Sequence, residues 1–296
     1  MYENGGNTTH RFLDSHPQMF VYPFESQPGT KYVLDHFSSM FPLKYRWPTF
    51  TLEATPYQDY KAIIDEECKV RARTPNSSKF KSYDFNFSDD ERCQRYIELI
   101  EKSGRSRSNN MIAFFRATFD VWKNYNTTGK EAFYVGYSPI ITIDADKILN
   151  ELPDAHFLHV VRNPWSAYAD TKKRAVPLSI EHYITAWNTN QYYALLNRDR
   201  FPDRMHIVRA EDVMSDSLGT LGGLCEKLGL ETHTALESPT WNGEKLAEVY
   251  PWGTIRKPTS EANLSTAHEL TKEEHEEIRL RTKQYVDFFE YQSFNK

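Results

Sequence analysis

Two short apolar runs in the C-terminal half of the chain are each followed by a helical pattern of hydrophobic positions. The first is "DAHFLHVVR" (154–162), which follows a Pro-Asp turn, and the second lies within "RMHIVRAEDV" (204–213). Short apolar runs bounded by turn residues are typical of buried strands. Because strands that alternate with helices form parallel sheets, this pattern predicts an α/β fold built from βαβ units.

Two later segments have the hydrophobic period and the end signals of helices. "SLGTLGGLCEKLGL" (217–230) places its leucines on one face and ends near Gly229, a typical helix terminator. "TKEEHEEIRLRTKQYVDFFEY" (271–291) begins with a threonine cap and an acidic first turn. We expect an amphipathic helix in the first segment and a terminal helix in the second.

The region between residues 43 and 134 has a mainly helical pattern. It is interrupted by "KSGRSRSNN" (102–110), which we predict to be a mobile loop. We interpret the region as a helical insert that covers the edge of the sheet. A chain of 296 residues with 39% hydrophobic content can bury a full core. We therefore expect a single domain over residues 1–296, with the insert at about 43–134.

Composition narrows the classes of function. No run approaches the roughly 18 consecutive apolar residues of a membrane span, and the N-terminus lacks the features of a secretory signal. A net charge of -5 gives no general attraction to nucleic acid, so an anion site must be local. The three cysteines, Cys68, Cys93 and Cys225, have neither disulfide nor zinc spacing. We expect a soluble cytoplasmic protein that binds no membrane, nucleic acid or metal.

The stretch "NGGNTTHRFLDSHP" (4–17) stands directly before a helical pattern. A glycine-containing turn that enters a helix presents consecutive backbone N–H groups, and together with the helix dipole these form an anion site. The alternative is the flexible, capped start of an ordinary helix. The stretch lacks the GK[ST] ending of a nucleoside-triphosphate P-loop, which disfavours a Mg-ATP site. The candidate anion-binding residues are Gly5, Gly6, Asn7, Thr8 and Thr9.

A second candidate anion site follows the first predicted strand. Arg162 ends the strand, Asn163 stands at a helix cap and Pro164 at the first helical position. Asp170 and Arg174 are four residues apart and share a helix face, so a surface salt bridge between them is the alternative to a ligand site. Two helix N-termini at the carboxyl ends of parallel strands indicate a ligand with two separated phosphates.

The segment "LPDAHFLHVVRNPWSAYADTKKR" resembles the sulfotransferases that use 3'-phosphoadenosine 5'-phosphosulfate (PAPS), especially the bacterial and tyrosylprotein-type branch. In that family an arginine, a serine eight residues on and an arginine twelve residues on hold the 3'-phosphate. Arg162 and Arg174 match the two arginines, whereas Asp170 stands in place of the serine. The resemblance leaves two alternatives: Thr171 or Ser166 supplies the hydroxyl, or Asp170 only orients Arg174.

The opening stretch is similar to the family's 5'-phosphosulfate loop, Pro-Arg-Ser-Gly-Thr-Thr, and to the Leu-Asp-Ser-His-Pro that ends the following helix. An ungapped comparison puts Gly5 on the family's glycine, with Gly6 and Asn7 on its threonines. A two-residue deletion instead aligns "GNTT" with "SGTT". Neither register supplies the loop arginine. The resemblance implies a P-loop-like parallel β-sheet flanked by helices, with the 5'-phosphosulfate at this turn.

The resemblance implies further site residues. Downstream of His-Pro the family has a catalytic glutamate in an extended segment, which is Glu25 here, and His10 is the second candidate base. "YPWGTIRKP" resembles a late loop whose basic residue closes over the cofactor, with Lys257 as the candidate and Arg256 as its neighbour. "GYSP" stands where many members have Lys-Thr-Pro, so Tyr137 replaces a lysine.

The activity that the resemblance implies is sulfuryl transfer from PAPS to a hydroxyl or amine of a small-molecule acceptor, without a metal. Backbone N–H groups would stabilise the leaving phosphate of adenosine 3',5'-diphosphate, and the glutamate would remove the acceptor proton. We expect a natural-product acceptor, with glycans and peptides left open. The segments "MFPLKYRWPTF" and "MIAFFRATFDVWKNY" line either an acceptor cleft or the core. The alternative functions are a non-catalytic sulfotransferase-like nucleotide-binding protein and a P-loop kinase.

Overall fold

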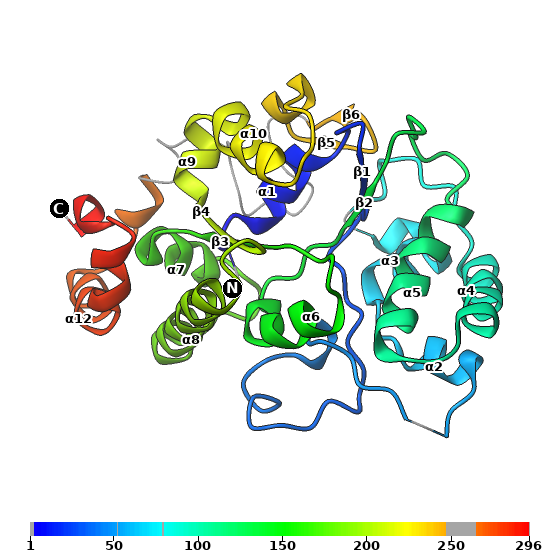
Figure 1. Cartoon of the computed structure of the whole chain (residues 1–296). Helices are drawn as coiled ribbons and strands as arrows, with labels where there is room; N and C mark the ends of the chain where they lie inside the picture. Colours follow the sequence, from blue (N-terminus) through cyan, green and yellow to red (C-terminus); the bar gives the residue numbers. More distant parts are fainter. Residues whose placement is uncertain (1–2, 52, 79, 247–264, 296) are drawn as a thin grey trace. The chain divides into compact units, whose positions relative to one another are not determined.

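The computed structural model of the chain describes residues 3–51, 53–78, 80–246 and 265–295. Its contacts divide the chain into two compact units, whose elements are labelled in Figure 1. Unit 1 comprises Met1–Leu13, Ala155–Pro239 and Lys245–Lys296, and unit 2 comprises Asp14–Asp154 and Thr240–Glu244. The single domain expected from the sequence stays a prediction.

Unit 1 is built on two parallel strands, β3 (Phe157–Val161) and β4 (Met205–Arg209). These are the two predicted strands, and their parallel pairing confirms the predicted βαβ unit. Helices α7 and α8 lie on one face of the pair, and α1 and α9 lie on the other (Figure 1). The described part of the unit contains α1 (Gly6–Leu13), α7 (Pro164–Lys172), α8 (Ile180–Arg200), α9 (Ala210–Ser215), α10 (Ser217–Lys227) and α12 (Lys272–Phe288), with 3-10 helices η4 (Thr234–Glu237) and η5 (Gln292–Asn295).

Helix ends in unit 1 follow the local signals of the sequence. The Asn163 side chain accepts a hydrogen bond from Ser166 N at 2.9 Å, and Pro164 is the first residue of α7. Thr271 caps α12. Gly229, just beyond α10, has a φ of 70°, a left-handed conformation that glycine adopts without strain. The predicted helices at 217–230 and 271–291 are therefore confirmed.

One buried imidazole lies on β3. His159 is 2% exposed, and its Nε2 lies 2.8 Å from Oε1 of Gln191 on α8. Burial disfavours the charged form of the ring and lowers the pKa of His159 to about 4. His159 is therefore neutral in the folded protein at neutral pH.

We expect the free energy of unfolding to fall as the pH drops from about 6.5, the ordinary histidine pKa, toward the folded-state pKa of His159. Below pH 6.5 the histidine of the unfolded chain binds a proton that the buried ring of the folded protein does not bind. The contribution of His159 to the free energy of unfolding is therefore complete above pH 6.5 and is lost as the pH falls toward the folded-state pKa. The full contribution is about 3 kcal/mol. Urea titrations at a series of pH values measure it. The His159→Gln variant should lack this part of the pH dependence, and identical pH dependence in both proteins would refute the assignment.

Unit 2 contains a second parallel pair, β1 (Met19–Val21) and β2 (Phe133–Val135), in which Met19 pairs with Phe133. Helices α2–α5 occupy the region between residues 43 and 134, in agreement with its mainly helical pattern. None of the described helices is long and apolar enough to span a membrane. The other elements are α2 (Pro56–Ala62), α3 (Glu66–Arg73), α4 (Asp89–Ser103), α5 (Arg107–Val121), α6 (Ala145–Glu151), the 3-10 helices η1 (Leu43–Tyr45), η2 (Pro75–Ser77) and η3 (Ile141–Asp144), and the short strands β5 (Thr240–Trp241) and β6 (Glu244–Lys245).

The loop predicted at 102–110 is wrong over most of its length. Helix α4 ends at Ser103 and α5 begins at Arg107, so only residues 104–106 lie between them. Ser106 Oγ accepts a hydrogen bond from Asn109 N at 3.0 Å, and Asn109 Nδ2 donates to Ser103 O at 2.9 Å. The serines and asparagines that indicated a loop are the residues that cap and connect the two helices.

Aromatic side chains form much of the core of unit 2. The ring of Trp241 lies 6.1 Å from that of Phe24 and 5.6 Å from that of Trp122, centroid to centroid. Trp122 and Trp47, from the two aromatic-rich segments, are 3% and 4% exposed. These tryptophans therefore belong to the core and do not line an open acceptor cleft.

Candidate functional site

The segment before α1 is a tight turn that ends at the helix N-terminus. Asn4 Oδ1 accepts a hydrogen bond from Gly6 N at 3.0 Å, and Asn4 Nδ2 donates to Val160 O on β3 at 2.9 Å. The Asn4 side chain thus forms an Asx turn that leads into the helix, and it joins this turn to the strand. Asparagine favours such turns, so the sequence carried this signal, although no role was predicted for Asn4.

Gly5 makes the turn possible. Its φ is 83°, and a Cβ built on it would lie 2.7 Å from the Cβ of Ala210, the first residue of α9. Its carbonyl accepts hydrogen bonds from Thr9 N at 2.9 Å and Thr9 Oγ1 at 3.0 Å. The helix begins at Gly6, the position that the ungapped comparison gives to the first family threonine.

We expect Gly5→Ala to lower the free energy of unfolding by about 1–3 kcal/mol, because the added methyl group meets the Ala210 side chain and the left-handed conformation becomes strained. Urea titration measures the change. The matched control is Gly223→Ala within α10, where a Cβ would meet no described atom within 4 Å and φ is not left-handed. A Gly5→Ala protein as stable as the control would contradict the close approach.

The first turn of α1 carries hydrogen-bond donors without acceptors. Among the described residues, none accepts a hydrogen bond from the backbone N–H of Asn7 or Thr8. Thr8 is 1% exposed, and its Oγ1 has no hydrogen-bond partner within the described part of the chain. Unpaired N–H groups and the positive end of the helix dipole together favour an anion. This turn is therefore a candidate phosphate site.

Arg162 lies one residue beyond β3 and contacts both the opening turn and α7. Its Nη1 donates to Glu3 O at 2.9 Å and to Asp170 Oδ2 at 2.8 Å. The side chains of Arg162 and Asp170 are 5% and 4% exposed. Arg162 Nε is buried and has no hydrogen-bond partner among the residues that the structure describes. The structure therefore brings together the two segments that the sequence analysis selected as anion sites.

The salt bridge between Asp170 and Arg174, which was the alternative to a ligand site, is not the ion pair that Asp170 forms. The structure pairs Asp170 with Arg162 in place of Arg174, and Lys173 Nζ lies 3.3 Å from Asp170 Oδ1. Helix α7 ends before Arg174, whose Nη1 instead lies 3.3 Å from Glu3 Oε1. The rule that side chains four residues apart meet holds only while the helix continues.

Other predicted residues of unit 1 lie in buried positions. Thr171 is fully buried, and its Oγ1 donates to Tyr168 O at 2.7 Å. His10 on α1 is 3% exposed, and its Nδ1 lies 2.7 Å from Arg11 Nη2. Both side chains therefore have protein contacts that compete with a ligand. Two predicted residues lie outside the described part of the chain, namely Arg256 and Lys257.

The candidate base Glu25 lies in unit 2 beyond β1. Tyr45 OH donates to Glu25 Oε2 at 2.5 Å, and the backbone N of Glu25 donates to Glu67 Oε2 at 3.0 Å. Burial, together with the negative charge of Glu25, raises the pKa of Tyr45 above its usual value, so the phenol keeps its proton. Within the described residues, no group donates a hydrogen bond to Glu25 Oε1. One carboxylate oxygen of Glu25 is thus held by Tyr45 OH.

Tyr45 and Glu67 are functional candidates that the sequence analysis missed. They are 20 and 42 residues from Glu25 along the chain, and no local signal connects them to it. Tyr137, which replaces the family's lysine, lies beside the same segment, because its carbonyl accepts a hydrogen bond from Ser26 N at 2.6 Å.

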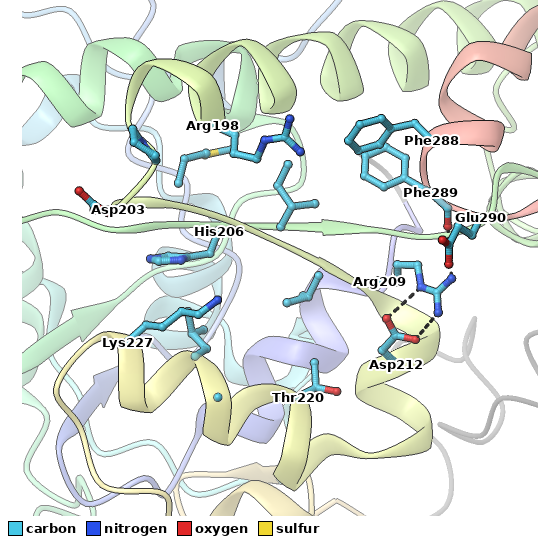
Figure 2. A pocket seen from close by; sticks show the side chains of 16 residues that line it. Arg198, Asp203, His206, Arg209, Asp212, Thr220, Lys227, Phe288, Phe289 and Glu290 are labelled. Atoms are coloured by element: carbon cyan, nitrogen blue, oxygen red, sulfur yellow. Dashed lines mark hydrogen bonds and ion pairs between the residues drawn. The ribbon is translucent and has the colours of Figure 1, made fainter.

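A large cavity lies elsewhere in unit 1. It has a volume of about 1050 Å³, and strand β4, helix α10 and the end of α12 form its walls (Figure 2). Arg209 in its wall donates two hydrogen bonds to Asp212, at 2.9 and 2.6 Å. No predicted site residue is among its described lining residues. The cavity is therefore separate from the candidate anion site.

Comparison with known proteins gives one family and two similar structures. A family model described as "Sulfotransferase family" matches residues 5–234. The sulfotransferase domain from the Synechococcus PCC 7002 olefin synthase is 18% identical with a TM-score of 0.56, and the match covers 98% of this chain and 92% of that chain. The sulfotransferase domain from the curacin biosynthetic pathway is 14% identical with a TM-score of 0.51, over 95% and 94% of the two chains. No curated protein sequence matches significantly. The structural matches establish a shared α/β fold with parallel strands.

Proposed function

The chain belongs to the sulfotransferase family, and we propose that it transfers a sulfuryl group from PAPS to a hydroxyl or amine of a small-molecule acceptor. The nucleotide product is adenosine 3',5'-diphosphate, and the proposed architecture is the P-loop-like parallel sheet of the family. The observation that carries the proposal is the contact between the turn before α1 and Arg162. It joins the two candidate anion sites within unit 1.

The proposed position of the 5'-phosphosulfate is the N-terminus of α1. Gly5 allows the turn to form, and the N–H groups of Asn7 and Thr8 with the Thr8 hydroxyl are donors for phosphate oxygens. Negative charge builds on the departing phosphate as sulfur leaves it, and fixed donors stabilise that charge. Removal of one donor in such a site typically costs on the order of 2.7–4 kcal/mol of activation free energy.

Glu25 is the proposed general base, with His10 as the second candidate. Tyr45 holds Glu25 Oε2, which leaves Oε1 to take the acceptor proton. The acceptor oxygen or nitrogen then forms a bond to sulfur while the bond from sulfur to the 5'-phosphate oxygen breaks. The electron pair of the broken bond stays on the phosphate, and the proton stays on the carboxyl group.

The proposed acceptor is a small molecule of a natural-product pathway. The support is that the two similar structures are domains of an olefin synthase and of the curacin biosynthetic pathway. We also propose a cytoplasmic location. The support is that the chain's cysteines are buried and form no disulfide.

Mass spectrometry tests the proposed activity. We expect incubation with PAPS and a panel of hydroxylated and amino metabolites to give an acceptor whose mass has risen by one SO3, together with an equal amount of adenosine 3',5'-diphosphate. Protein inactivated by heat is the control. The proposal fails if a broad panel of acceptors yields neither product above that control.

A nucleotide-binding protein without activity and a P-loop kinase are the alternatives. The kinase would need a lysine in the turn before α1, and residues 3–9, ENGGNTT, contain none. An inactive binder would be stabilised by adenosine 3',5'-diphosphate, by about 2.7 kcal/mol at a concentration 100 times Kd, but would give no sulfated product.

A further inference from the structure

The ion pair between Arg162 and Asp170 occupies the place where the resemblance to the sulfotransferases puts the 3'-phosphate of the donor. The pair is formed at 2.8 Å between side chains that are 5% and 4% exposed. A buried arginine beside a carboxylate has a partner already, and a phosphate that approached it would meet the negative charge of Asp170. Like charges at such short range disfavour each other strongly where water is excluded.

The neighbouring cations have carboxylate partners too. Lys173 Nζ lies 3.3 Å from Asp170 Oδ1 and 2.8 Å from Glu269 Oε2. Arg174 Nη1 lies 3.3 Å from Glu3 Oε1, and the Glu3 side chain is 12% exposed. Each described cation around this point is therefore balanced by an acid, so the positive field that a phosphate dianion needs is largely cancelled.

A ribose hydroxyl suits this arrangement better than a phosphate does. A carboxylate accepts a hydrogen bond from a sugar hydroxyl, and nucleotide-binding folds use an acidic residue for a free ribose hydroxyl and an arginine for a phosphorylated one. Here the arginine is present but paired, and the acid is Asp170. The α1 turn thus fits the 5'-phosphate of the nucleotide, whereas the paired Arg162 and Asp170 do not fit a 3'-phosphate.

We propose that Asp170 is a specificity-determining residue that lets the chain accept a donor with a free ribose 3'-hydroxyl, adenosine 5'-phosphosulfate, about as well as PAPS. This inference rests on the proposed function. The chemistry at sulfur is unchanged: the acceptor forms its bond to sulfur, the bond from sulfur to the 5'-phosphate oxygen breaks, and Glu25 takes the proton. The nucleotide product from this donor is adenosine 5'-phosphate.

Titration calorimetry with the two product nucleotides tests the inference without turnover. For the wild-type protein we expect the Kd values of adenosine 5'-phosphate and adenosine 3',5'-diphosphate to agree within about tenfold, because the charged contact of the 3'-phosphate with Arg162 is lost to Asp170. In Asp170→Ser the arginine becomes available, and we expect the preference for the diphosphate to rise by about 10- to 100-fold.

Two further variants provide a substitute for Asp170→Ser and a control. Asp170→Asn removes the charge at nearly constant size, so it should shift the preference in the same direction if Asp170→Ser does not fold. The matched control is Asp212→Ser, which breaks the ion pair between Arg209 and Asp212 in unit 1. It should leave the preference for adenosine 3',5'-diphosphate unchanged. The ratio of kcat/KM for the two donors should follow the ratio of affinities.

The outcomes separate the inference from the proposed function. A wild-type preference for adenosine 3',5'-diphosphate above about tenfold, or a preference that the Asp170 variants do not change, would overturn the inference and leave the proposed function standing. Absence of binding by both nucleotides would overturn both.

Discussion

Glu25→Gln is expected to lower the rate of sulfuryl transfer by about 10²- to 10⁴-fold, the usual contribution of a general base. The amide keeps the size of the side chain and can still accept the hydrogen bond from Tyr45 OH, but it cannot take the acceptor proton. Affinity for adenosine 3',5'-diphosphate should be unchanged, because the proposed nucleotide contacts belong to other residues. Steady-state kinetics and calorimetry measure the two quantities.

The matched control for Glu25→Gln is Glu98→Gln, a half-exposed glutamate on α4 of the same unit that pairs with Arg95 at 3.0 Å. This control should retain wild-type turnover. If Glu25→Gln also retained it, the base would have to be another residue, and His10 would be tested next. If the rate fell together with nucleotide affinity, a structural role for Glu25 would explain the loss.

Arg92→Met is expected to lower the free energy of unfolding by about 3–5 kcal/mol, because it leaves the buried Asp65 carboxylate without its ion-pair partner. Arg92 is fully buried in unit 2, 2.8 Å from Asp65 Oδ2 and 3.0 Å from Asp89 Oδ1. Its Nε also donates to Tyr60 OH at 2.7 Å. Methionine fills most of the space of the arginine side chain, so the change isolates the loss of charge from the loss of volume.

The control for this stability prediction is Arg95→Met, one turn along α4. Arg95 forms ion pairs with Asp120 at 2.7 Å and Glu98 at 3.0 Å, but its side chain is 35% exposed. Exposed pairs contribute about 0–1 kcal/mol, so Arg95→Met should have little effect. Equal losses for the two variants in urea titration would contradict the buried ion-pair account.

Local features of the fold could be predicted from the sequence because neighbouring residues determine them. The Asn163–Pro164 start of α7 and the Thr271 cap of α12 are one-turn signals, and both are present. The two strands of unit 1 were predicted from their apolar runs for the same reason. The segment 102–110 misled the prediction because serine and asparagine favour both loops and helix caps.

Contacts between distant segments could not be predicted. Tyr45 reaches Glu25 across 20 residues, and no pattern in the sequence links the two. The Asp170–Arg162 pair joins the end of a strand to a helix, and helical spacing offered only Arg174 as a partner for Asp170. The segments chosen from the sequence led to the correct family. The ion pairs around Arg162 could not be predicted, because they depend on the three-dimensional positions of the side chains.

The most direct measurement of the central claim is a crystal structure of the protein with adenosine 3',5'-diphosphate. The account predicts the 5'-phosphate against the N–H groups of Asn7 and Thr8, and the 3' side of the ribose beside Arg162 and Asp170. A nucleotide seated instead in the cavity along β4, with the α1 turn and Arg162 untouched, would contradict it.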